Sequence, residues 1–210
     1  MRNNGPLTGS ISMTSGSRTK ALTVILTLAM SSVHAHDENQ FRVVMRMLAS
    51  ITESHVEYRE IKSLTILDST IEQTGMLSYY APATVVREVR QPISETFAVD
   101  GDTLIIRRAD TEKVIQMDTN PIIRAFVESF RATLSGNVEL LNEHYHIEFS
   151  GTVIEWKLQL SPKSRKLKRF ISSIELEGQQ TLIGRIEITE SNGDWSRMEL
   201  TPTNAIPNAE

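Results

Sequence analysis

The sequence predicts an α+β fold, mostly antiparallel β, in which a sheet of about eleven strands curves beneath two helices. The run from Ile71 to Met117 reads as five short strands joined by turns, a meander. Two other segments carry one apolar face each at helical spacing. Because two short helices cannot cover so much apolar strand face in a flat packing, we expect the sheet to curl. The pattern leaves open whether the interior is a packed core or an apolar cavity, since both need the same inward residues.

The clearest turn in the meander is Asp100-Gly101, which separates two apolar-rich runs and is a strong hairpin signal. A two-residue loop at this point pairs Val99 with Asp102. Phe97 then lies opposite Leu104, and both side chains project to one face because side chains alternate along a strand.

Two elements precede the meander. Apolar residues recur at helical spacing from Glu38 to Ile51, which predicts an amphipathic helix. His55 to Ser63 changes to a period of two, with Val56, Tyr58 and Glu60 on one side, and this pattern predicts the first strand.

A central helix follows the meander. Asn120 supplies a helix cap and Pro121 suits the first turn, where its missing N–H costs nothing. Gly136 suits the left-handed position that ends a helix, and a short helical turn follows at Val138 to Leu141. The apolar face of the central helix consists of Ile122, Ile123, Phe126, Val127, Phe130 and Leu134.

The C-terminal third returns to strands, with segments at Val153 to Leu160, Phe170 to Leu176 and Leu182 to Ile188. In the first of these, alternate residues should be buried. They are Ile154, Trp156, Leu158 and Leu160.

The last hairpin tests the register. A three-residue loop around Asn192-Gly193, which we favour over a two-residue loop, sets Ile188 against Met198 and Ile186 against Leu200.

The N-terminus has the pattern of a secretory signal peptide over residues 1–35. Basic residues precede an apolar run from Ala21 to Met30, and Val33-His34-Ala35 is a small-residue cleavage signal. A membrane anchor is the alternative, but the run is shorter than the roughly 20 residues that span a bilayer. We expect cleavage after Ala35 and an exported, soluble mature protein.

Charge and cysteine content exclude several classes of protein. The predicted signal peptide holds three of the 22 Lys and Arg, which leaves 19 against 26 Asp and Glu, so nonspecific nucleic-acid binding is not expected. The chain has no cysteine, which excludes a disulfide scaffold, a thiolate metal site, a Cys nucleophile and a lipid-modified Cys.

The order of these elements and several local motifs resemble the LolA family of periplasmic lipoprotein carriers, and more closely its divergent LolA-like branch. The resemblance covers about Phe41 to Leu200, and the order and spacing of the pieces carry it rather than any single motif. The pieces are the strand at residues 55–64, the run Gly75 to Pro82, the turn Val99 to Leu104, Asn120-Pro121, Leu134 to Gly136, and Trp156 to Pro162.

The resemblance implies an unclosed, strongly curved half-barrel with helices as a lid over an apolar cavity. It divides the chain into a signal peptide (1–35), a lipid-carrier domain (36–202) and a flexible tail (203–210). Two departures stand out: Ala81 occupies the place of a basic residue that helps to hold the lid shut in typical members, and the chain ends soon after its last strand, with the tail Thr201 to Glu210. Both departures suggest a cargo other than a lipoprotein.

A carrier of this kind implies an apolar cavity that takes a lipid or acylated cargo from an inner-membrane exporter toward an outer-membrane acceptor, as a monomer with transient membrane contact. A sensor or scaffold that uses the same half-barrel without transport is the alternative function. We predict that the cavity lining comprises Leu77, Tyr79, Phe97, Leu104, Trp156 and Leu158 from strands, and Phe126 and Phe130 from the lid.

Five cations lie within seven residues of this acidic protein, at Lys163, Arg165, Lys166, Lys168 and Arg169, and we call them the basic loop. They read either as a solvated loop or as a contact for anionic headgroups or an acidic partner near the cavity mouth.

Enzymatic motifs are missing. The chain has no G-x-S-x-G elbow, H-E-x-x-H pair or phosphate-binding glycine loop, so we expect a binding protein without cofactor. His144 and His146 have no third ligand nearby and read as surface histidines rather than a metal site. Glu53, Glu57 and Glu60 read as a solvated face before an acid/base pair.

Overall fold

The computed structural model describes residues 38–203, apart from residues 68 and 120. The predicted signal peptide, all but the first residue of the predicted tail, and the helix cap at Asn120 lie outside the described residues.

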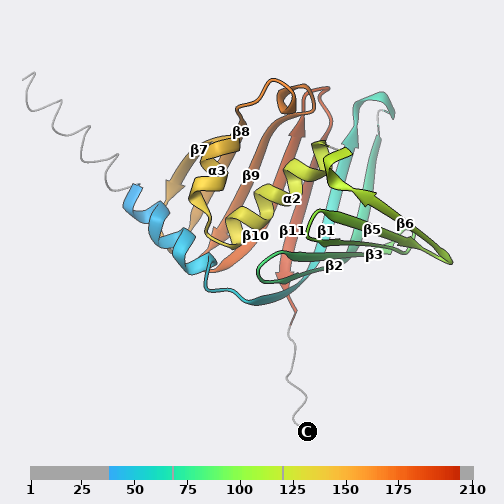
Figure 1. The fold of residues 1–210 in the computed structure, drawn as a ribbon, viewed down its shortest axis with the longest axis horizontal. Helices are drawn as coiled ribbons and strands as arrows, with labels where there is room; N and C mark the ends of the chain where they lie inside the picture. Colours follow the sequence, from blue (N-terminus) through green and yellow to red (C-terminus); the bar gives the residue numbers. More distant parts are fainter. Residues whose placement is uncertain (1–37, 68, 120, 204–210) are drawn as a thin grey trace, which may run out of the picture. The chain divides into compact units, whose positions relative to one another are not determined.

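In the described part of the chain, eleven antiparallel strands form one sheet. Figure 1 shows that this sheet does not close into a barrel. The strand order is β6-β5-β4-β3-β2-β1-β11-β10-β9-β8-β7, so among these strands only β1 and β11 are neighbours in space without being neighbours in sequence. This arrangement confirms the predicted fold class. The strands are β1 (Glu53–Leu64), β2 (Ser69–Tyr80), β3 (Thr84–Gln91), β4 (Glu95–Asp100), β5 (Thr103–Arg108), β6 (Thr111–Gln116), β7 (Tyr145–Gly151), β8 (Trp156–Pro162), β9 (Ile171–Gln179), β10 (Leu182–Glu190) and β11 (Trp195–Pro202).

Helices lie against one face of this sheet. The first helix covers residues 38–48, and α2 (Pro121–Leu134) and α3 (Val138–His144) follow the meander. Gly136 separates α2 from α3 with a φ of 64°, the left-handed conformation that the sequence predicts there. Short 3-10 turns complete the fold as η1 (Thr65–Leu67), η2 (Met117–Thr119) and η3 (Leu167–Arg169).

The hairpin between β4 and β5 differs in register from the prediction. Asp100 pairs with Thr103 and Val99 with Leu104, so Phe97 faces Ile106 and not Leu104. The turn closes around Gly101, whose φ is 56°, one residue later than expected. Because the pairing is shifted by two positions, the faces are preserved and Phe97 and Leu104 still project to the same side.

The last hairpin shows the same kind of shift. Ile186 pairs with Met198, and Ile188 pairs with Ser196, so the predicted partners were wrong by two positions while the inward face was right.

The start of β8 is also corrected. The strand begins at Trp156, and Ile154 lies in the preceding loop with 73% of its surface exposed, so its predicted burial was wrong.

Two apolar clusters occupy the helix-covered face. The larger one packs strands β7 to β11, the start of β1 and the end of β2 against the helices, with Leu48, Tyr145, Leu158, Leu160 and Leu176 among its most buried members. The smaller one joins Val99 and Leu104 of the meander to Met117 and to Val127 of α2.

Candidate functional site

A cavity of about 340 Å³ lies between the two clusters, under α2. Its volume falls at the lower end of the roughly 300–1,000 Å³ of small-molecule sites. Val127 on α2 borders it, and strands β1 to β5 and β9 to β11 and the β10–β11 turn contribute further wall residues. Among the described side chains, the apolar lining includes Leu64, Leu77, Val85, Phe97, Val99, Leu104, Val127, Ile171, Ile186, Ile188, Trp195 and Met198.

Three of the predicted lining residues border this cavity. They are Leu77, Phe97 and Leu104, which come from β2, β4 and β5. Alternation along the strands also brings in Val99, Ile186 and Met198, which sequence reasoning did not single out although each lies on the predicted inward face.

The other three predicted strand residues lie in the packed core. Leu158 is 1% exposed among the strands beneath the helices, and Tyr79 is 2% exposed. The indole of Trp156 lies over Gly178 on β9 and donates from Nε1 to the carbonyl oxygen of Gln180 at 3.0 Å. These three side chains belong to the larger apolar cluster and do not border the cavity. The side chains of Phe126 and Phe130 lie outside what the structure describes, although both residues belong to α2.

A charged pair interrupts the apolar wall. Arg87 on β3 donates from Nη2 to Oε2 of Glu60 on β1, and also to Oε1 of Gln73 at 2.9 Å. The Glu60 side chain is only 4% exposed, so its assignment to a solvated face was wrong. Lys62 lies 3.8 Å from the same carboxylate at the outer edge of the wall. Glu53 and Glu57 are exposed, as expected.

Arg87 reaches β1 by crossing over β2. Gly75, between the two strands, carries no side chain, and the ring of Tyr58 lies over it. The Arg87 guanidinium lies 4.9 Å from the centre of that ring and donates from Nε to the Tyr58 hydroxyl at 3.1 Å. Burial raises the pKa of Tyr58, while Arg87 opposes that shift. The absence of a side chain at Gly75 therefore leaves the space in which Tyr58 and Arg87 meet.

Helix α2 is tied to both halves of the sheet. Arg131 donates from Nη1 to the carbonyl oxygen of Gly101, at the β4–β5 turn, at 2.8 Å. Ser129 donates to the hydroxyl of Tyr145 on β7 at 2.7 Å, in a buried site. A movement of α2 away from the cavity therefore has to break contacts on both sides.

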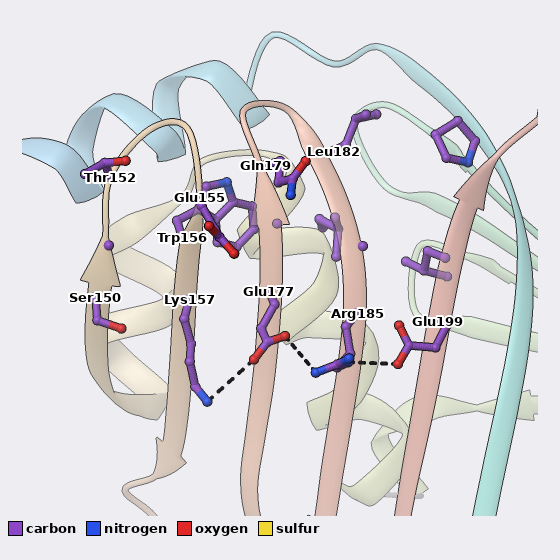
Figure 2. Close-up of a pocket in the computed structure, with 16 residues that line it drawn as sticks. Ser150, Thr152, Glu155, Trp156, Lys157, Glu177, Gln179, Leu182, Arg185 and Glu199 are labelled. Carbon is purple, nitrogen blue, oxygen red and sulfur yellow. Dashed lines mark hydrogen bonds and ion pairs between the residues drawn. The ribbon is translucent and has the colours of Figure 1, made fainter.

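The opposite face of the sheet carries a larger but polar groove, of about 810 Å³ (Figure 2). A row of ion pairs crosses it, from Lys157 to Glu177, then to Arg185 and Glu199. Arg185 bonds Glu177 at 3.0 Å and Glu199 at 2.8 Å. An acyl chain in this groove would lie against exposed, paired charges and not against an apolar wall. The cavity under α2 is therefore the better candidate for a lipid-binding site.

The basic loop lies between β8 and β9, and all five of its cations are exposed. It is anchored by the buried Leu167. None of the ion pairs among the described residues involves these cations. The loop leads directly into Ile171, which borders the cavity.

Within residues 38–203, gaps excepted, no group of three or more His, Asp or Glu is placed to hold a metal ion. No helix in the described part of the chain is long and apolar enough to cross a membrane.

Several solved structures are similar to this chain. The LolA superfamily protein NE2245 from Nitrosomonas europaea is 9% identical over 75% of this chain and 90% of its own, with a TM-score of 0.41. A DUF1329 family protein from Desulfovibrio piger is 9% identical over 81% and 94%, with a TM-score of 0.43. The Mycobacterium tuberculosis lipoprotein LppX is 12% identical over 78% and 92%, with a TM-score of 0.39. No curated protein sequence matches the chain.

A sequence model of one family matches residues 31–208, which is most of the chain. That family is described as outer membrane lipoprotein carrier protein LolA-like. The match spans every described strand and helix, including all the elements that border the cavity. This protein therefore belongs to the LolA-like family.

Proposed function

We propose that this protein is a periplasmic carrier that holds a lipid or an acylated cargo in the cavity under α2 and ferries it from an inner-membrane exporter toward the outer membrane. The single observation that carries the proposal is an apolar cavity beneath α2, a helix that hydrogen bonds to Gly101 and Tyr145 link to both halves of the sheet. Membership of a family described as lipoprotein carriers supports it. The proposal is for a binding protein that acts as a monomer, without cofactor or catalysis.

The physical need for such a carrier follows from the hydrophobic effect. Exposing an acyl chain of 16 carbons to water costs on the order of 13 kcal/mol, at about 0.8 kcal/mol per methylene. A cavity lined by Phe97, Leu104 and Met198 replaces the bilayer around part of the chain. The affinity has to remain moderate, because a cargo that is bound too well is not released.

Its modest volume supports a cargo with one acyl chain in the cavity at a time. A bulkier cargo needs α2 to move outward, which breaks the bonds of Arg131 and Ser129 described above. A lid that opens for cargo and closes behind it fits a carrier.

Blocking each pocket separately tests the proposal. Ile188→Trp fills the cavity from a partly buried position on its wall, and Ser150→Trp adds the same bulk to the polar groove on the other face. We expect native mass spectrometry of protein purified from membranes to show bound lipid in the unchanged protein and in Ser150→Trp, and little in Ile188→Trp. Full retention of lipid by Ile188→Trp, or its loss only in Ser150→Trp, would refute the proposed site.

A transfer assay separates a carrier from a sensor. A carrier should accelerate the movement of a fluorescent fatty acid from donor to acceptor vesicles in proportion to protein concentration. A protein that binds the fatty acid without accelerating its transfer fits a sensor or scaffold and not a carrier.

A further inference from the structure

We propose that the rim at one end of the half-barrel is a membrane-docking surface that meets anionic lipid headgroups and presents the cavity to the bilayer. Three segments form this rim: the basic loop, the turn between β10 and β11, and η1. The inference rests on the proposed function, because it assigns that function a partner surface, and it commits to one occupant, an anionic bilayer.

Hydrogen bonds join the three segments into one surface. The backbone N–H of Ser191, in the β10–β11 turn, donates to the carbonyl oxygen of Phe170 at 3.0 Å, and its hydroxyl donates to the carbonyl oxygen of Lys168 at 2.7 Å. On the other side of the turn, Asp194 accepts from the backbone N–H of Thr65 at 2.7 Å. The basic loop and η1 therefore share a single central turn.

The same three segments border the cavity. Ile171 follows the basic loop, Leu64 precedes η1, and Asp194 belongs to the central turn, and all three residues line the cavity. Lipid that leaves a bilayer at this rim would enter the cavity without crossing the rest of the protein surface.

Charge at the rim complements an anionic surface. The five cations of the basic loop are exposed and outnumber the two acids that border the cavity there, Glu190 and Asp194. Asp194 is engaged with Thr65 and Asn192 at the turn. Cations elsewhere on the sheet are mostly paired with acids, as in the row from Lys157 to Glu199, whereas no ion pair among the described residues uses the basic loop. The free positive charge is therefore concentrated beside the cavity.

An apolar side chain stands at the same rim. Ile66, in η1, is 91% exposed, the most exposed large apolar residue among those described. An isoleucine exposed to water lacks the favourable free energy of apolar burial. Insertion into a bilayer interface next to a cluster of basic residues would bury this side chain. Cationic and apolar contacts together bind a membrane more tightly than either kind alone. Such binding is still reversible, as a carrier that has to leave the membrane requires.

Vesicle binding by the mature protein tests the proposal. We expect the protein to sediment with vesicles of phosphatidylcholine and phosphatidylglycerol in equal parts, and not with pure phosphatidylcholine, and to be released by high salt. Replacing the five cations of the basic loop by Gln should weaken binding by about tenfold or more. Ile66→Ser should weaken it by roughly threefold to tenfold.

Matched variants control for net charge and for apolar exposure. The charge control replaces five exposed cations outside the rim by Gln. They are Arg42, Arg46, Arg107, Arg108 and Lys113. The apolar control is Ile154→Ser, which removes a 73% exposed side chain from the β7–β8 loop. Both controls should bind the anionic vesicles like the unchanged protein. Equal loss in test and control variants, or no binding to anionic vesicles at all, would overturn the proposal.

A second measurement separates this proposal from the proposed function. Binding of a fluorescent fatty acid in solution without vesicles reports the cavity alone, and the rim variants should retain it. Loss of vesicle binding with retained fatty-acid binding supports the docking surface. Vesicle binding by a protein that takes up no fatty acid would refute the carrier and leave the docking surface standing.

Discussion

Arg131 on α2 and Gly101 at the β4–β5 turn are joined by a hydrogen bond of 2.8 Å between Nη1 and the carbonyl oxygen. The other two guanidinium nitrogens, Nε and Nη2, are buried and have no hydrogen-bond partner among the described residues. Burial lowers the pKa of Arg131, and the nearby Asp102 and Asp100 only partly oppose this shift. When α2 covers the cavity, the Arg131 cation therefore lies in a buried site that supplies a hydrogen-bond acceptor to one of its three nitrogens.

Arg131→Met should therefore stabilise the closed protein. A hydrogen bond to a charged group contributes about 1.5–3 kcal/mol, whereas each buried donor left without a partner costs about 1–3 kcal/mol, and Arg131 has two of these. We expect the free energy of unfolding in urea to rise on the order of 1 kcal/mol and the release of a bound fatty acid to slow.

The exposed Arg124, about two turns before Arg131 on α2 and bonded to Glu128 at 2.7 Å, provides the control. Arg124→Met should change stability by less than about 0.5 kcal/mol. Faster release and lower stability in Arg131→Met would instead show that the bond to Gly101 dominates and that Arg131 holds the lid shut.

The ion pair of Glu60 and Arg87 should be sensitive to the loss of either member. Removing one partner of a buried pair costs about 3–5 kcal/mol when both are fully buried, and Arg87 is 20% exposed, so we expect about 2–3 kcal/mol for Glu60→Leu or Arg87→Met. The double variant should recover most of this loss, because no charge is then left buried alone. Urea unfolding of the four proteins of this double-mutant cycle measures the coupling.

Glu57→Gln serves as a control for this cycle. Glu57 pairs with Arg90 at 3.2 Å with both side chains more than half exposed, so its loss should cost less than about 1 kcal/mol. Additive single and double effects at Glu60 and Arg87 would mean that the pair does not couple.

The same pair shows where sequence reasoning stops. Period-two alternation put Glu60 on the inward side with Val56 and Tyr58, yet a carboxylate in that position reads as solvated unless its partner is known. The partner, Arg87, lies 27 residues away and two strands across the sheet, a pairing that no local pattern specifies.

The two-residue alternation of side chains along a strand explains why part of the cavity lining could still be predicted. Both hairpin registers were wrong by two positions, and a shift of two leaves every side chain on its own face, so Phe97 and Leu104 remained inward. Trp156 and Leu158 carry the same alternating signal but lie in the packed core. The helices decide which part of this inward face is packed with side chains and which part borders the cavity. Where the helices pack is set by contacts between residues distant in sequence.

Gly75→Ala should be strongly destabilising. A Cβ at this position would lie 1.8 Å from the carbonyl oxygen of Glu88 and 2.9 Å from Cε1 of Tyr58. Backbone cannot give way as a flexible side chain can, so we expect a loss of about 3 kcal/mol or more in thermal or urea unfolding. Gly184→Ala, where the nearest atom is 4.0 Å away, should stay within about 0.5 kcal/mol. Equal stability of the two variants would mean that β2 and β3 are not as closely apposed as described.

The buried bond from Ser129 to Tyr145 predicts how stability depends on alkaline pH. Burial raises the pKa of the Tyr145 hydroxyl, and the Ser129 bond only partly opposes this. Below about pH 10, the usual pKa of tyrosine, the hydroxyl is protonated in folded and unfolded chains alike, so its contribution is constant. Above that pH the unfolded chain loses the proton first, and stability falls until the pH passes the raised pKa of the folded state.

Tyr145→Phe should therefore be less stable than the unchanged protein at neutral pH, by about 1 kcal/mol for the lost hydrogen bond. This difference in the free energy of unfolding should narrow as the pH rises above about 10. Tyr58 and Tyr79, whose pKa values burial also raises, remain in both proteins and account for the alkaline decline that persists. Ser129→Ala removes the same bond but keeps the phenol. Because that bond lowers the pKa of Tyr145, the stability of Ser129→Ala should fall with pH at least as steeply as that of the unchanged protein. Urea unfolding across this pH range measures all three, and a gap for Tyr145→Phe that stays constant would show that Tyr145 ionises equally in both states.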